Sequence, residues 1–138
     1  MNRGDLQRLS DVRLQESRAL LAAGFPEGAY YLAGYAMECG LKACIARQTR
    51  EHDFPPDRRQ VERIYSHDLN GLLDVAGLSS DLKSLVDGSP AVELDWNTIK
   101  DWSEKSRYEQ RTHEEAQALL DAIERENGGL LRWVRQRW

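Results

Sequence analysis

The stretch AYYLAGYAMECGLKACIAR, residues 29–47, is apolar almost all round when it is drawn as a helix. A helix without a polar face must lie at the centre of a fold, with other elements on most of its sides. Gly34 and Gly40 each lower helix propensity by about 1 kcal/mol, and we expect close packing of neighbouring helices to compensate. The stretch therefore predicts a central buried helix over residues 28–47.

The composition of the whole chain indicates one all-α domain. Its 138 residues are the size of an ordinary domain, with 41% hydrophobic and 30% charged residues. Leu and Ala are abundant, there are 4 prolines, and runs of β-branched residues are missing, so helix is favoured over sheet. We expect a single helical domain over residues 1–138, built as a bundle of four main helices plus short ones.

A first helix is predicted over Asp5–Ala23 from its hydrophobic spacing. The residues expected on its core face are Leu9, Val12, Ala19, Leu20 and Ala23. Beyond the central helix, Pro55-Pro56 excludes helix from the loop over residues 48–59, and short helices are expected between residues 60 and 102.

The last main helix is predicted to begin at Thr112. Thr112-x-x-Glu115 is a capping-box pattern, in which each residue's side chain bonds the backbone N–H of the other. Apolar residues follow at helical spacing, and Asn127-Gly128-Gly129 should end or kink the helix.

The charge balance, the cysteines and the apolar segments indicate which ligands and which cellular compartment are expected. The net charge is 19 − 23 = −4, so contact with nucleic acid would need a local basic patch. Cys39 and Cys44 lie about 140° apart on a helix, so we expect two reduced core residues in a cytoplasmic protein. The N-terminus has no apolar signal-peptide core. The longest apolar segment, residues 29–46, contains Glu38 and Lys42 and is shorter than the ~20 residues of a membrane span.

The segment SRYEQRTHEE, residues 106–115, holds a candidate catalytic pair. His113 is the first residue of the predicted last helix, where the positive end of the helix dipole favours a neutral imidazole. A neutral histidine can take the proton of a ribose 2′-hydroxyl, and Arg107 could bind the scissile phosphate. In the alternative interpretation, Arg107 makes a surface or interface ion pair and His113 is an ordinary exposed residue.

Three more polar residues are candidates for lining a cleft. Glu38 and Lys42 are one turn apart on the apolar helix, where they either form a structural ion pair or border a polar pocket. His67, in YSHDL, could instead be structural, bonded to a backbone carbonyl or to a carboxylate such as Asp68. The three histidines are scattered, with no cluster at ligand spacing, so neither a metal site nor a cofactor is expected.

Three segments form a combination that is typical of a known family. They are A-x-E-x-x-L-K-A at residues 36–43, YSHDLNGLL at residues 65–73, and the pair Arg107-Tyr108 ahead of the last helix. Together they resemble the HEPN domain (higher eukaryotes and prokaryotes nucleotide-binding), and the chain looks most like the small bacterial stand-alone HEPN proteins. The resemblance extends from about residue 10 to the end of the chain.

The resemblance implies a bundle of four to five helices that forms a homodimer. Many members are metal-independent RNases with an R-x4–6-H motif at the dimer cleft, often toxins paired with a nucleotidyltransferase antitoxin or parts of phage-defence systems. Arg107 and His113 match that spacing, and Tyr108 would line the cleft. Catalytic members usually carry Asn, Asp or His where this chain has Tyr108, and other HEPN domains bind nucleotides or partners without catalysis. The expected function is endoribonuclease, with a non-catalytic module as the alternative.

Overall fold

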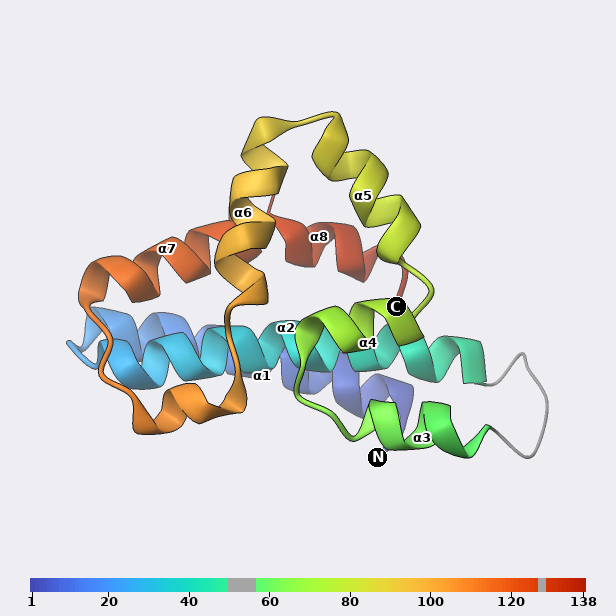
Figure 1. Ribbon diagram of the computed structural model, residues 1–138. Helices are drawn as coiled ribbons and strands as arrows, with labels where there is room; N and C mark the ends of the chain where they lie inside the picture. Colours follow the sequence, from blue (N-terminus) through green and yellow to red (C-terminus); the bar gives the residue numbers. More distant parts are fainter. Residues whose placement is uncertain (50–56, 127–128) are drawn as a thin grey trace.

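The computed structural model describes residues 1–49, 57–126 and 129–138, and every regular element in these ranges is a helix (Figure 1). In chain order they are α1 (Arg3–Ala22), α2 (Pro26–Thr49), α3 (Arg58–Ile64), α4 (Leu69–Val75), α5 (Ser79–Asp87), α6 (Pro90–Lys100), the 3₁₀ helix η1 (Glu104–Tyr108), α7 (His113–Glu124) and α8 (Leu130–Arg135). The all-α prediction is confirmed. Within the described ranges, no helix combines the length and the apolar character that crossing a membrane requires.

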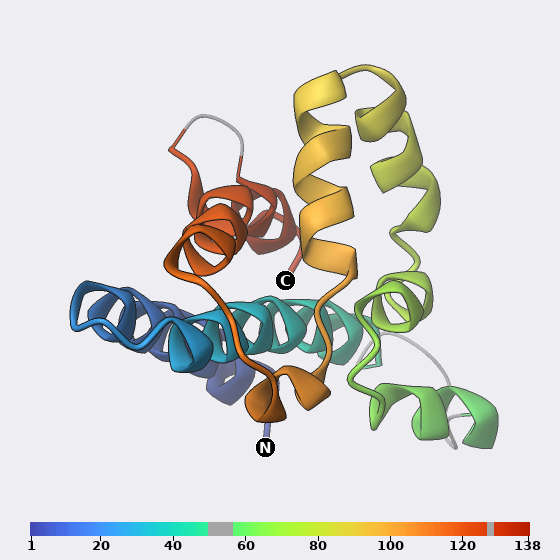
Figure 2. The ribbon, with the colours of Figure 1, turned by 60° about the vertical axis from the view of Figure 1, so that its left-hand side comes forward.

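Helix α2 is the centre of the molecule, as its sequence predicted. Of its 24 residues, 13 are buried, and it packs against α1, α4, η1, α7 and α8. Figure 1 shows α1 running alongside α2, with α7 and α8 above this pair and η1 and α3 below it. Helices α5 and α6 lie side by side and project away from α2, on the side of α2 where α7 lies (Figure 2). Two different sides of α2 therefore receive η1 and α7, the elements that hold Arg107 and His113.

The glycines of α2 allow close packing. The indole of Trp102 occupies the space in which a Cβ of Gly34 would lie. On another side of the helix, a Cβ at Gly40 would come within 3.1 Å of the Leu131 side chain of α8. The close approach of neighbouring elements, expected from the glycines, is confirmed.

The predicted core face of the first helix is wrong. The buried residues of α1 are Ser10, Leu14, Ser17 and Leu21, whereas the five predicted residues are half-buried or exposed. The Ser10 hydroxyl donates to the Ala36 carbonyl at 2.7 Å, and the Ser17 hydroxyl donates to the Ala29 carbonyl at 2.6 Å. Small hydroxyl side chains let α1 approach α2 closely while their hydrogen bonds are satisfied there.

Helix ends differ slightly from the prediction. Helix α1 begins at Arg3, because the side chains of Asn2 and Asp5 form a capping box there. Helix α2 continues to Thr49 and α3 begins at Arg58, both inside the predicted loop. Residues 50–56, with the two prolines, and residues 127–128 of the predicted helix break lie outside the described ranges.

Both cysteines are core residues, as expected. Cys39 and Cys44 are each 2% exposed and are not joined in a disulfide. Burial raises the pKa of each thiol to about 11. Both thiols therefore stay protonated at neutral pH.

Candidate functional site

The start of α7 is built as the capping-box pattern predicts. The backbone N–H of Glu115 donates to the Thr112 hydroxyl at 3.1 Å, and the N–H of Thr112 donates to the Glu115 carboxylate at 3.3 Å. His113 is the first residue of the helix. Two N–H groups of the helix entry are thus satisfied, so this position of His113 is determined by local sequence.

Three of the charged residues around this helix start are paired with one another. The Arg111 guanidinium contacts the carboxylates of Glu109 at 2.5 Å and Glu115 at 3.0 Å. It also lies over the Tyr30 ring, 4.2 Å from the centroid. The Arg111 guanidinium, with the Thr112 N–H, lowers the pKa of the Glu115 carboxyl. Arg111 is therefore a structural residue whose single positive charge offsets part of the charge of two nearby carboxylates.

Arg107 and His113 differ from Arg111 in having no ionic partner among the described residues. The Arg107 guanidinium lies 4.8 Å from the ring centroid of Tyr108, which is 79% exposed. A surface ion pair of Arg107 is thus not found among the described residues, whereas an interface ion pair stays a prediction. Both the guanidinium and the imidazole are available for a ligand.

His113 lines a cleft of about 190 Å³ between α1 and α7. The other lining residues are Arg18, Leu21, Ala22, Gln117, Leu120 and Glu124. Arg18 and Glu124 form an ion pair across this cleft, which joins the two helices.

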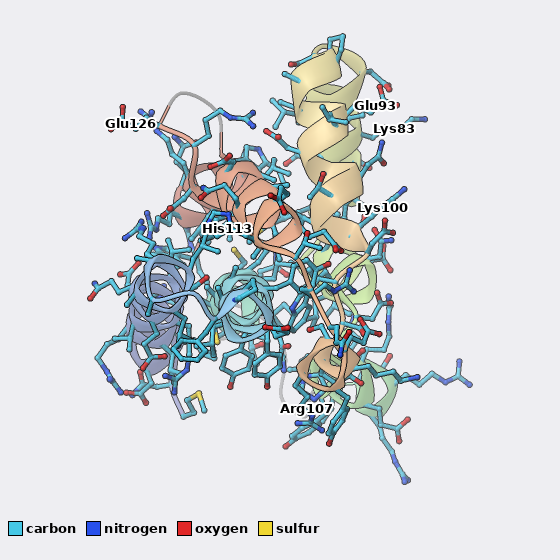
Figure 3. The ribbon with its side chains drawn as sticks, turned by 90° about the vertical axis from the view of Figure 1, so that its left-hand side faces the viewer. Lys83, Glu93, Lys100, Arg107, His113 and Glu126 are labelled. Atoms are coloured by element: carbon cyan, nitrogen blue, oxygen red, sulfur yellow. The ribbon has the colours of Figure 1, made fainter. Side chains whose placement is uncertain are left out.

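One chain does not bring Arg107 and His113 together. Figure 3 shows Arg107 on η1, below α2, whereas His113 lies above α2 at the start of α7. The segment between them passes the N-terminal half of α2, and the Arg111–Tyr30 contact holds it there. Within one chain, Arg107 and His113 therefore do not face a common site.

The other three candidates do meet. Glu38 has 2% of its side chain exposed, and its carboxylate accepts from Lys42 Nζ at 2.7 Å. His67 Nδ1 lies 3.0 Å from each oxygen of the same carboxylate. Asp68, the alternative partner considered for His67, instead accepts from the N–H groups of Asn70 and Gly71 and caps α4. Glu38, Lys42 and His67 form one polar cluster, called the Glu38 cluster below.

An aromatic row beside this cluster was missed from the sequence. Tyr31 stacks on Trp102, with ring centroids 6.2 Å apart, and on Tyr35, with centroids 6.1 Å apart. The Arg13 guanidinium lies over the far ring, 6.0 Å from the Tyr35 centroid. Tyr31 and Tyr35 are one helical turn apart, and this spacing was the available signal. The row links α1, α2 and the segment just before η1.

The described ranges hold no group of three or more His, Cys, Asp or Glu side chains placed to bind a metal ion. No protein family, curated protein or solved structure matches this chain.

Proposed function

We propose that this protein is a metal-independent endoribonuclease of the HEPN type that works as a homodimer. The Arg107 guanidinium of one copy would bind the scissile phosphate, and His113 of the other copy would take the proton of the 2′-hydroxyl. Attack by the 2′-oxygen would leave a 2′,3′-cyclic phosphate. As the family resemblance implies, the partner that restrains such a toxin would be a nucleotidyltransferase-type antitoxin.

One observation carries this proposal. In the segment from η1 to α7, Arg111 is paired with Glu109 and Glu115, whereas Arg107 and His113 have no ionic partner among the described residues. Two carboxylates that share a guanidinium repel a phosphate less than two free ones, and an unpaired guanidinium with an unpaired imidazole is what transesterification of RNA needs. The segment thus combines a set of paired charges with two open functional groups.

The test is cleavage of a single-stranded RNA by the purified protein in excess chelator. Arg107→Ala and His113→Ala should each lose cleavage by two orders of magnitude or more, on the order of the contribution of a phosphate-binding or proton-transfer group. Lys105→Ala is the matched control, because Lys105 is an exposed cation on the same short helix as Arg107. It should keep most of the activity. An inactive wild-type protein, or an active Arg107→Ala variant, would refute the proposal.

Mixing the two inactive variants tests whether the site is shared between copies. Random exchange of subunits makes half of the dimers mixed, and each mixed dimer holds one complete site of two. About a quarter of the wild-type activity should therefore return. No recovery in a mixture that has exchanged subunits would show that Arg107 and His113 do not act across the dimer.

A second function is favoured by the contact between Arg107 and Tyr108. A guanidinium stacked on an exposed tyrosine ring can hold a phosphate while the ring stacks on a base, without any proton transfer. The chain would then be a HEPN module that binds a nucleotide or a nucleotidyltransferase partner. Nucleotide binding that Tyr108→Ala weakens and His113→Ala does not, in a wild-type protein that leaves RNA intact, would favour this function.

A further inference from the structure

Glu38 is the most deeply buried charged side chain in the described part of the chain. It lies on the central helix, where an apolar residue would pack without needing partners. Its carboxylate is bonded to Lys42 on the same helix and to His67, which is 29 residues away in sequence. A buried carboxylate that binds a partly exposed histidine indicates a candidate functional site in addition to an internal ion pair.

The carboxylate determines how the His67 ring is used. A carboxylate only accepts hydrogen bonds, so Nδ1, 3.0 Å from both oxygens, carries a proton. In the neutral ring, Nε2 then has the free lone pair. No described residue bonds Nε2, and 45% of the His67 side chain is exposed. A ring held by a carboxylate at one nitrogen and open at the other has the arrangement of general acid–base histidines.

Lys42 sets the charge of the cluster. Its ammonium lies 2.7 Å from the Glu38 carboxylate, so these two charges cancel. With a neutral His67 the Glu38 cluster has no net charge, and with an imidazolium it has one positive charge. A ligand with a negative charge is therefore not repelled by the cluster in either state.

The Glu38 cluster lies on the same side of α2 as Arg107. Tyr31, Tyr35, Glu38 and Lys42 follow one another at steps of four, three and four, so they form one stripe along the helix. Trp102, just before η1, stacks on Tyr31 of this stripe, and His67 bonds Glu38. Figure 2 shows η1 and the loop before α4 next to each other along α2. By contrast, His113 lies on the other side of α2 (Figure 3).

We propose that His67 is a second proton-transfer residue of the RNA site that includes Arg107, and that Glu38 is its positioning residue. This proposal rests on the proposed function and adds to it the general acid. The 2′-oxygen bonds to phosphorus, and the 2′-hydroxyl proton passes to neutral His113 of the partner copy. The bond from phosphorus to the 5′-oxygen breaks, and this oxygen receives the Nε2 proton of the His67 imidazolium. The products are a 2′,3′-cyclic phosphate and a 5′-hydroxyl, without metal or water.

The decisive variant is His67→Asn. The asparagine amide can still donate to Glu38 in place of Nδ1, but it has no group at the position of Nε2. His67→Asn should fold like the wild type, as circular dichroism and thermal unfolding would show, and should lose RNA cleavage about 100-fold or more. Full activity of a folded His67→Asn variant, with Arg107→Ala and His113→Ala inactive, would overturn this inference and leave the proposed function standing. A wild type that cleaves no RNA would refute both.

A second measurement uses the wild-type protein and does not depend on how variants fold. Diethyl pyrocarbonate acylates unprotonated imidazole nitrogens, and mass spectrometry reads each histidine separately. A 2′-O-methyl oligoribonucleotide, which lacks the attacking hydroxyl, should protect His67 from acylation. Equal acylation of His67 with and without the bound oligonucleotide would overturn the proposal.

The role of Glu38 is tested by Glu38→Gln, which keeps the shape and removes the charge. If Glu38 acts through His67, the pH profile of kcat/KM should shift in this variant, because the negative charge beside the imidazolium is gone. A residue with only a structural role would lower activity at every pH and leave the profile in place. An unshifted profile would remove Glu38 from the proposal.

Discussion

The indole ring of Trp102 lies against Gly34 of α2, in the space that a Cβ of residue 34 would occupy. Trp102 is 2% exposed and comes directly before η1, the short helix that holds Arg107. Trp102 also stacks on Tyr31, which lies about one helical turn before Gly34 on α2. This contact therefore anchors the segment on which the candidate site depends.

Replacing Gly34 by alanine should destabilise the protein. The added methyl group overlaps the buried ring, and overpacking of this kind costs about 1–3 kcal/mol, which exceeds the gain of about 1 kcal/mol in helix propensity. Urea unfolding would measure the change. Gly28→Ala is the control, since its Cβ would meet only the flexible end of Leu20 at 3.1 Å. A Gly34→Ala variant as stable as Gly28→Ala would show that Trp102 does not pack on residue 34.

Loss of the buried ion pair in the Glu38 cluster should lower the free energy of unfolding more than loss of an exposed ion pair does. Lys42→Met leaves the buried Glu38 carboxylate without its cation and should lower the free energy of unfolding by about 3 kcal/mol. Arg63→Met breaks the exposed pair with Asp74 and should lower it by less than about 1 kcal/mol. Chemical denaturation of both variants provides the comparison. Similar losses in the two variants would contradict the buried pairing of Glu38.

The capping box should determine how firmly the start of α7 is held. Thr112→Ala removes the side-chain acceptor of the Glu115 N–H and should lower stability by about 1 kcal/mol, whereas Thr112→Ser keeps a hydroxyl and should lose less. Hydrogen exchange of the Glu115 N–H should speed up in the alanine variant only. If both variants exchange at the wild-type rate, the cap does not hold the helix entry where His113 lies.

The two buried thiols predict a loss of stability at alkaline pH. The pKa of each rises from 9.0 to about 11 on folding, because burial disfavours the thiolate. The folded form thus keeps protons that the unfolded chain releases, and the stabilisation present below pH 9 is lost as the pH rises through 11. Between these values, the free energy of unfolding should fall more steeply in the wild type than in a variant with Cys39→Ala and Cys44→Ala. Equal slopes would show that the thiols titrate alike in both states.

Much of the fold could be predicted because helix signals are local. The apolar stretch over residues 28–47 predicted the central helix, and Thr112 with Glu115 predicted the start of α7, since a capping box involves only four residues. The core face of α1 could not be predicted in this way. Ser10 and Ser17 look like surface residues until the carbonyls of α2 are placed opposite them.

The same distinction between local and long-range contacts applies to the candidate site. Sequence alone determined that Arg107 precedes a capped helix beginning with His113, and that Glu38 and Lys42 share one turn, because these relationships span a few residues of one backbone. Only the tertiary structure decided that His67 joins Glu38 and that α2 lies between Arg107 and His113. Such contacts depend on how helices distant in sequence pack around α2, and no local spacing specifies that packing.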